Sequence, residues 1–275
     1  MHVHSSASDG TDPPADVVRR AAADPDVSVI ALTDHDTTAG WEEARNALPQ
    51  TLTFVPGMEL SCLLDGRSVH VLAYLFDPGD EELSRQTSLI RDDRTYRARQ
   101  MVAKLGDLGA GVTWEQVARI AGDAVVGRPH IARALAEAGV VDTPADAFTA
   151  EWIADGGRAY VERYALAAGH AIRLVRAAGG VPVLAHPRSP GYEVSDEAIA
   201  GLAAAGLAGV EAFHPDHDDS ERISLTALAR TLSLITTGGS DDHGSFNSSG
   251  IGAETTPEDQ YELLIAEARP RAERI

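Results

Sequence analysis

Short apolar runs alternate with helix-like stretches over most of the chain. The run at residues 27–32 is rich in apolar and β-branched residues, which is typical of a strand buried in a parallel sheet. Similar runs predict seven strands, at residues 1–4, 27–32, 51–55, 69–75, 181–185, 208–213 and 232–236. Because helical stretches separate most of them, we expect a parallel sheet with helical crossovers, and seven such strands favour a closed or nearly closed barrel.

The helices that complete this alternation are predicted from start signals and spacing. Pro13 and Pro14 precede the first one, since proline is favoured in the first helical turn. The expected helices lie at residues 15–23, 38–48, 170–178, 196–205, 219–230 and 257–268.

The alternation stops between residues 80 and 165. This stretch has no strong strand signal, and it predicts a long helix over 81–108 and short helices over 114–121, 129–138 and 145–153, separated by glycines. We therefore expect a barrel domain made of residues 1–79 and 166–275, and a small helical insert domain over residues 80–165 that covers the active site.

Composition narrows the class of protein. A hydrophobic fraction of 44% and a charged fraction of 24% are ordinary for a globular protein. The formal net charge of −19 argues against a protein that grips long nucleic acid, and the single cysteine, Cys62, excludes an intrachain disulfide and a thiolate zinc site. No apolar run approaches the ~20 residues that cross a membrane, and the N-terminus lacks signal-peptide features, so we expect a cytoplasmic protein without a membrane partner.

Metal-ligand residue types gather at or near the predicted strand ends. In His2-Val3-His4 both imidazoles lie on one face, because strand side chains alternate. Taken singly, a histidine beside a strand is usually structural and an aspartate before glycine usually marks a turn. Together, six segments supply nitrogen and oxygen ligands, and this coincidence favours a site for Zn, Mn or Fe. The candidate ligands are His2, His4, Asp9, His35, Glu59, His70, His186, Asp241 and His243.

These motifs occur in the order found in a known family. The matching segments are His2-Val3-His4, Thr33-Asp34-His35, Gly57-Met58-Glu59, His70, Ala185-His186-Pro187 and Gly239-Ser240-Asp241-Asp242-His243. The chain thereby resembles the PHP (polymerase and histidinol phosphatase) family of metal-dependent phosphoesterases, although a longer strand usually precedes the first motif. The resemblance implies an α/β fold, a distorted (β/α)7 barrel with a small helical insert domain. The segment Gly127–Arg133 further resembles the subgroup that acts on 3',5'-bisphosphonucleotides or as a 5'-3' exonuclease on short RNA.

The resemblance also implies three divalent metal ions, Mn, Fe or Zn. By resemblance, His2, His4, Glu59 and Asp241 hold the first ion, Glu59, His70 and His186 the second, and Asp9, His35 and His243 the third. We expect Glu59, Asp241 and His243 to serve catalysis directly. A hydroxide that bridges the first two ions would attack phosphorus, while the cations stabilise the charge on the phosphoryl oxygens.

Substrate contacts are predicted less directly. Arg128 and Arg188 are candidates for phosphate, since a guanidinium matches phosphate geometry, although Arg128 could instead pair with an acid of the insert. His217 is a candidate substrate contact, whereas His214 beside it matches no metal position. We expect His130 to cap a helix. Aromatic residues make up only 5% of the chain, so a small nucleotide or an oligonucleotide end is favoured over a long polymer.

The sequence therefore predicts a metal-dependent phosphoric ester hydrolase that acts on nucleotides or short 5'-phosphorylated RNA. Two alternatives stay open. One is a histidinol-phosphate phosphatase, which the insert disfavours because a small substrate needs less cover. The other is a non-catalytic metal-binding regulatory module, which the nine filled ligand positions disfavour.

Overall fold

The computed structural model describes residues 1–191, 193–246 and 250–268 of the chain. It divides into two compact units. One consists of Met1–Thr87 and Ala165–Ile275, and the other of Ser88–Tyr164. All the candidate metal ligands belong to the first unit.

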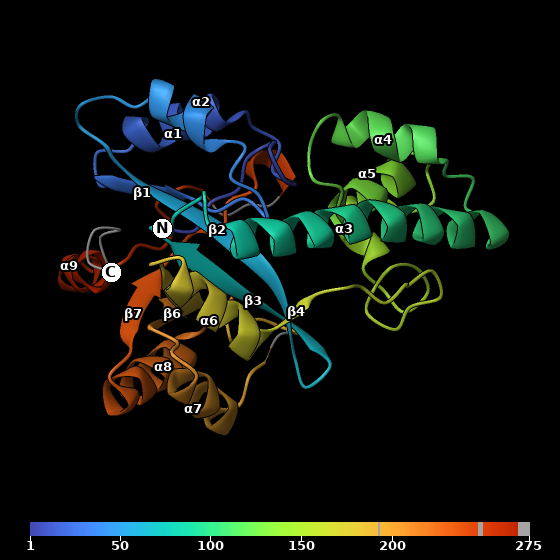
Figure 1. The fold of residues 1–275 in the computed structure, drawn as a ribbon. Helices are drawn as coiled ribbons and strands as arrows, with labels where there is room; N and C mark the ends of the chain where they lie inside the picture. The colour runs from blue at the N-terminus through green and yellow to red at the C-terminus, as the bar shows by residue number, and fades with distance from the viewer. Residues whose placement is uncertain (192, 247–249, 269–275) are drawn as a thin grey trace. The chain divides into compact units, whose positions relative to one another are not determined.

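The first unit is an α/β structure built on one curled sheet (Figure 1). Its seven strands are β1 (Val29–Leu32), β2 (Thr53–Leu64), β3 (Arg67–Tyr74), β4 (Leu166–Ala167), β5 (Val181–Leu184), β6 (Gly209–Phe213) and β7 (Ile235–Gly238). The order across the sheet is β1-β2-β3-β5-β6-β7, and β4 pairs with β2. All four residues of β5 are buried, as expected of an apolar run in the middle of a sheet.

Helices in the first unit pack one apolar face and expose the other. Their bounds are α1 (Pro14–Ala23), α2 (Trp41–Asn46), α6 (Ala168–Ala177), α7 (Asp196–Ala204), α8 (Asp219–Leu232) and α9 (Glu258–Glu267). In α1, Val17, Val18 and Ala21 are buried, and burying an aliphatic side chain as large as valine stabilises the fold by about 1.5–3 kcal/mol. Within the described part of the chain, no helix has the length and apolar character needed to cross a lipid bilayer.

The predicted all-parallel sheet is wrong at β3, which is antiparallel to both β2 and β5. Asp65 and Gly66 connect β2 and β3 with positive φ angles of 50° and 78°. Asp-Gly between two apolar runs favours such a tight hairpin turn. The third strand, predicted to end at residue 55, therefore continues to Leu64 and turns straight back. As a result, Glu59 and His70 come from the middle of long strands and not from strand ends.

The predicted first strand is also wrong, because residues 1–4 contribute only an isolated bridge between Val3 and Asp242. The amino group of Met1 donates to the Gly238 carbonyl at 2.8 Å, and the Asp241 N–H donates to the His2 carbonyl at 2.9 Å. On the other side, the Thr33 N–H donates to the Val3 carbonyl at 2.9 Å. This segment therefore links the ends of β7 and β1, the two outer strands of the sheet, and brings His2 and His4 between them.

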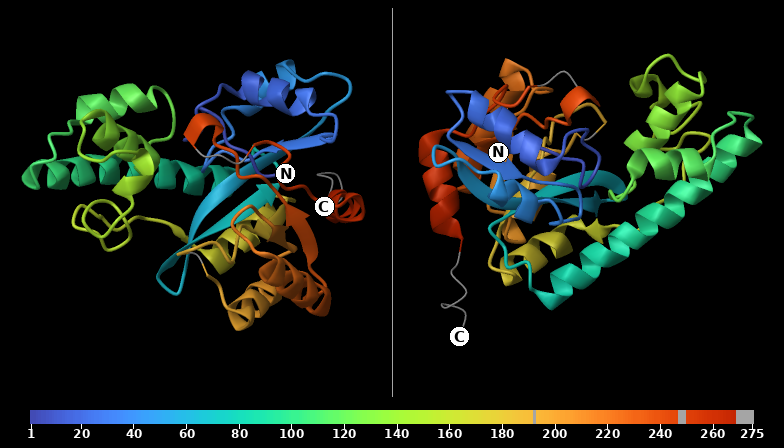
Figure 2. Two further views of the ribbon diagram at one scale, coloured as in Figure 1. Left: turned by 180° about the vertical axis from the view of Figure 1, so that it is seen from behind. Right: turned by 90° about the horizontal axis from the view of Figure 1, so that it is seen from above.

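The second unit contains helices and no strand among residues 88–164. Its elements are α4 (Trp114–Ala121), α5 (Arg128–Glu137), the 3₁₀ turn η1 (Pro144–Ala147) and most of α3 (Glu81–Asp107), a 27-residue helix that Figure 2 shows as continuous. Met101, Leu105, Ile131 and Leu135 form part of its own core. The helix predicted at 145–153 is wrong. The chain leaves the 3₁₀ turn at Phe148, where ψ is 58°, and then folds back on itself in further turns.

Candidate metal centre

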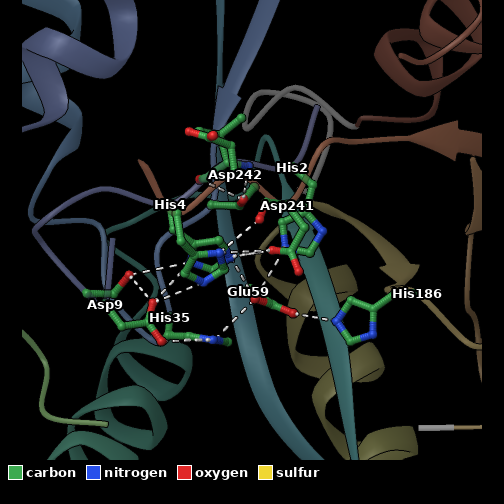
Figure 3. Close-up of polar contacts among 12 residues, drawn as sticks. His2, His4, Asp9, His35, Glu59, His186, Asp241 and Asp242 are labelled. Atoms are coloured by element: carbon green, nitrogen blue, oxygen red, sulfur yellow. Dashed lines mark hydrogen bonds and ion pairs between the residues drawn. The ribbon is translucent and has the colours of Figure 1, made fainter. Parts of the chain in front are cut away.

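The candidate ligands meet at one place in the first unit, where Figure 3 shows most of them around Glu59. Seven of the nine are buried. The side chain of Asp241 is 24% exposed, whereas those of His243, His35 and His70 are 13%, 11% and 11% exposed, so solvent reaches the cluster chiefly beside Asp241. The structure thus gathers residues that lie more than 200 positions apart in the sequence.

Four donor atoms form one compact group: His2 Nε2, His4 Nε2, Glu59 Oε2 and Asp241 Oδ1. The two imidazole nitrogens are 3.1 Å apart. Glu59 Oε2 lies 3.3 Å from His2 and 3.0 Å from His4, and Asp241 Oδ1 lies 3.2 Å from each. Ligand atoms held about 2.1 Å from a single ion stand about 3.0–3.4 Å apart in octahedral or tetrahedral coordination. The donor set therefore fits one divalent cation.

Glu59 faces a second group with its other oxygen. Oε1 lies 2.7 Å from His70 Nδ1 and 3.2 Å from His186 Nε2, and these two ring nitrogens are 3.3 Å apart. His35 Nδ1 also approaches Glu59, at 3.2 Å from Oε2. One carboxylate thus has an oxygen on each of two neighbouring donor groups, which is the geometry that a bridging ligand requires.

A third group forms around Asp9. Its Oδ1 lies 3.4 Å from His243 Nε2 and 3.6 Å from His4 Nδ1, and its Oδ2 lies 3.7 Å from His35 Nε2. The rings of His4 and His243 stack with centroids 4.1 Å apart. This group is looser than the first, yet its nitrogen and carboxylate donors are of the same kind.

The charges of the cluster are strongly coupled. Burial raises the pKa of Glu59, but the nearby imidazoles of His70, His35 and His2 outweigh it and hold that pKa well below its usual range. Burial lowers the pKa of His2, but carboxylates including Asp241 raise it to about 10. The carboxylates therefore favour protonation of the neighbouring imidazoles, and a cation would compete with protons for the same nitrogens.

The backbone at the site adopts conformations that most side chains avoid. His186 and Asp241 both have positive φ angles, 28° and 47°. Non-glycine residues with positive φ often mark functional sites. Gly239 is required for a different reason, since a Cβ there would lie 2.2 Å from the Cβ of His2. The Gly239–His243 segment can therefore approach the N-terminal motif closely enough to add Asp241 to it.

Glu211 in β6 is a site residue that the sequence reasoning missed. It is fully buried, and both its oxygens lie 3.2 Å from His2 Nδ1. The N–H of His186 also donates to its Oε2, at 2.9 Å. Glu211 thereby fixes the ring of His2 with Nε2 toward the cluster and ties it to the His186 loop. A lone acid inside the apolar run of residues 208–213 was the available signal.

Two aspartates within the motifs hold the ligand loops in place. Asp34 accepts from the Ser5 N–H at 2.8 Å and from the Ser8 hydroxyl at 2.6 Å, which fixes the loop after His4. Asp242 receives two hydrogen bonds of 3.0 Å from Arg20 in α1, one on each oxygen. The acid beside the ligand histidine in each motif thus anchors a neighbouring segment, the loop after His4 for Asp34 and helix α1 for Asp242.

Replacing Glu211 with glutamine should weaken cation binding by about 10–100-fold, the usual cost of losing a partner that orients a ligand. The amide keeps the size of the side chain but removes the charge that faces His2. Isothermal titration of the metal-free protein with Mn²⁺ measures the change, and circular dichroism checks the fold. Unchanged affinity would contradict the role given to Glu211.

The residues predicted to contact substrate are engaged elsewhere. Arg128 donates to Asp155 Oδ1 at 2.6 Å within the second unit, which is the alternative pairing considered above. Arg188 donates to Asp196 and to the Val194 carbonyl.

For His217 the geometry argues against a substrate contact. Both ring nitrogens bond to backbone, Nδ1 to the Ala212 carbonyl at 3.0 Å and Nε2 to the Arg188 N–H at 3.2 Å. The predicted cap at His130 is confirmed, because its Nδ1 accepts from the Gly127 N–H at 3.0 Å.

The known proteins that this chain resembles are enzymes that act on phosphate esters. The chain is 32% identical to a 3',5'-nucleoside bisphosphate phosphatase of Chromobacterium violaceum, over 91% of this chain and 85% of that protein. It is 32% identical to the 5'-3' exoribonuclease Rnm of Salmonella typhimurium, over 88% and 84% of the two chains. It is also 31% identical to a phosphoribosyl 1,2-cyclic phosphate 1,2-diphosphodiesterase of Eggerthella lenta, over 90% and 94%. No family model matches the sequence.

A solved structure from Bifidobacterium adolescentis, classed as a metal-dependent phosphoesterase, has the same fold. The TM-score is 0.92 at 34% identity, and the match covers 99% of this chain and 97% of that one. The match to this structure extends over both units of the chain. The chain belongs to the PHP family of metal-dependent phosphoesterases.

Proposed function

We propose that this protein releases phosphate from nucleotides, with 3',5'-bisphosphonucleotides or the 5' ends of short RNA as substrates. The observation that carries the proposal is the group of four donor atoms, from His2, His4, Glu59 and Asp241, at mutual distances suited to one cation. The activities of the bisphosphate phosphatase and exoribonuclease relatives support the nucleotide part.

The donor groups would hold three divalent ions, of Mn, Fe or Zn. The first group is His2, His4, Glu59 and Asp241, the second is Glu59, His70 and His186, and the third is Asp9, His35 and His243. When bound, the cations would neutralise phosphoryl oxygens and activate water as the nucleophile. A distorted (β/α)7 barrel, closed by residues 1–4, is the scaffold that we infer for them, with the helical insert as a separate domain.

The protein's own residues define how a phosphate would enter. Asp241 is the most accessible member of the cluster, so a phosphate would approach from its side, while Glu59 is only 1% exposed. Nitrogen and carboxylate donors at fixed positions would hold the cations without rearrangement of these side chains during the reaction. A cluster of bound cations would also explain how a chain of net charge −19 could attract an anionic substrate.

The roles of Arg128 and Arg188 stay predictions. Either guanidinium would have to leave its present carboxylate, Asp155 or Asp196, to bind a second phosphate. A phosphate with two negative charges competes well for a partly exposed arginine, because its oxygens accept paired hydrogen bonds.

Three other functions remain to be tested beside this one. A histidinol-phosphate phosphatase would need only the donor groups and no contact with a nucleoside. A cyclic phosphodiester is favoured by the relative from Eggerthella lenta. A regulatory module without activity would bind the ions and hydrolyse nothing.

A phosphate-release panel with the Mn²⁺-loaded protein separates these functions. The substrates are 3'-phosphoadenosine 5'-phosphate, AMP, short 5'-phosphorylated RNA, a ribose cyclic phosphate and histidinol phosphate. We expect the highest kcat/KM on the bisphosphorylated nucleotide or the RNA. Good activity on histidinol phosphate with none on any nucleotide would overturn the proposal.

A further inference from the structure

His214 lies at the metal centre but belongs to none of the three donor groups. It follows β6 directly and is only 3% exposed. Its Nε2 lies 3.5 Å from Asp241 Oδ2, and its ring centroid lies 5.3 Å from that of His186. Among the described residues, none forms a hydrogen bond of good geometry with Nε2. Such a buried polar atom is uncommon in folded proteins and calls for an explanation.

The hydrogen-bond partners of His214 Nδ1 determine which ring nitrogen carries the hydrogen. The backbone N–H of Asp216 lies 3.1 Å from His214 Nδ1, and an amide N–H can only donate. Nδ1 therefore accepts, so the hydrogen of the neutral ring is on Nε2. The Ser189 hydroxyl, 3.4 Å from Nδ1, is placed as a second donor to the same nitrogen. The N–H at Nε2 consequently points toward the carboxylate of Asp241.

The two oxygens of that carboxylate face different partners. Oδ1 lies 3.2 Å from both His2 Nε2 and His4 Nε2, in the donor group that fits a cation. Oδ2 faces His214. A donor on Oδ2 would stop the carboxylate from rotating and would leave Oδ1 as the ligand atom.

The backbone around His214 holds this donor in place. Arg222 of α8 donates to the His214 carbonyl at 3.1 Å. The Gly239 N–H donates to the Phe213 carbonyl at 3.0 Å, which joins the start of the Asp241 segment to the end of β6. His214 and Asp241 are thus fixed to each other through two adjacent strands.

We propose that His214 is a positioning residue for Asp241: with a cation in the donor group, the 3.5 Å separation closes so that Nε2–H donates to Oδ2, and this directs Oδ1 toward the cation shared with His2 and His4. The inference rests on the proposed function, because it requires a cation in that donor group. It adds a specific role for a residue that supplies no ligand atom.

The test compares Mn²⁺ binding to the metal-free full-length protein and its variants by isothermal titration. His214→Ala should weaken one class of site by about 10–100-fold and lower turnover at limiting Mn²⁺. Excess Mn²⁺ should restore that turnover. His214→Gln, whose side-chain amide can place an N–H near the former Nε2, should recover most of the affinity. Ser189→Ala is the matched control, since it leaves Nε2 and its partner in place, and its affinity should stay within about twofold of the wild type.

The possible failures are distinguishable. If the wild type binds no Mn²⁺, the proposed function fails and this inference with it. If the wild type binds Mn²⁺ and His214→Ala binds it equally, with only KM raised, His214 contacts substrate and the inference is overturned. Imidazole ¹⁵N spectra of the folded wild type, assigned with the His214→Gln variant, give an independent reading. They should show hydrogen on Nε2, and hydrogen on Nδ1 would contradict the proposal.

Discussion

Replacing Glu59 with glutamine is expected to remove more than one equivalent of bound metal and nearly all activity. Its Oε1 faces His70 and His186 at 2.7 and 3.2 Å, and its Oε2 faces His2 and His4 at 3.3 and 3.0 Å. Glutamine keeps the size of the side chain but has one oxygen and no charge. It can therefore satisfy one donor group at most, and the other loses its anionic ligand.

Elemental analysis of the purified variant, alongside its phosphate release, measures both effects. Glu42→Gln makes the same chemical change at an exposed position of α2 and should leave metal content and activity unchanged. Full metal occupancy in Glu59→Gln would contradict the bridging role.

Replacing His35 with alanine is expected to remove one ion and leave two. Its Nε2 lies 3.7 Å from Asp9 Oδ2, whereas the first group of His2, His4, Glu59 and Asp241 is complete without it. Turnover should fall roughly 100-fold or more, the usual cost of losing a charge that stabilises the transition state.

His243→Ala provides the matched comparison, because His243 belongs to the same donor group around Asp9. Both variants should stay folded by circular dichroism and should lose the same equivalent of metal. Normal turnover of His35→Ala at modest Mn²⁺ would contradict the three-ion proposal and favour a binuclear site.

Most helix positions, though not the one expected at 145–153, could be predicted from sequence because their signals are local. The bounds predicted for α4 agree with the structure, since Thr113 caps its first turn and Gly122 ends it. The direction of β3 could not be read from apolar runs, because alternation of apolar and polar residues is the same in either direction. The Asp65-Gly66 turn was the sequence signal for an antiparallel β3, and the prediction did not use it.

The donor cluster could be anticipated because histidine and acid types recur near the predicted strand ends. How the groups share ligands could not, since it depends on rotamers and on distances between distant segments. His4 illustrates this, because its Nε2 faces Glu59 and its Nδ1 faces Asp9. Glu211 and His214 escaped prediction for a related reason. Each acts through another side chain, and a sequence shows residue types but not which atoms face each other.

The proposed function requires the donor cluster to hold cations that hydrolyse a nucleotide phosphoester. The most direct test adds Mn²⁺ stepwise to the metal-free protein and follows phosphate release from 3'-phosphoadenosine 5'-phosphate, with bound metal counted at each step. We predict no release from the metal-free protein and full activity only when three equivalents are bound. Release that is independent of bound metal, or full metal binding without release from any nucleotide, would contradict the account.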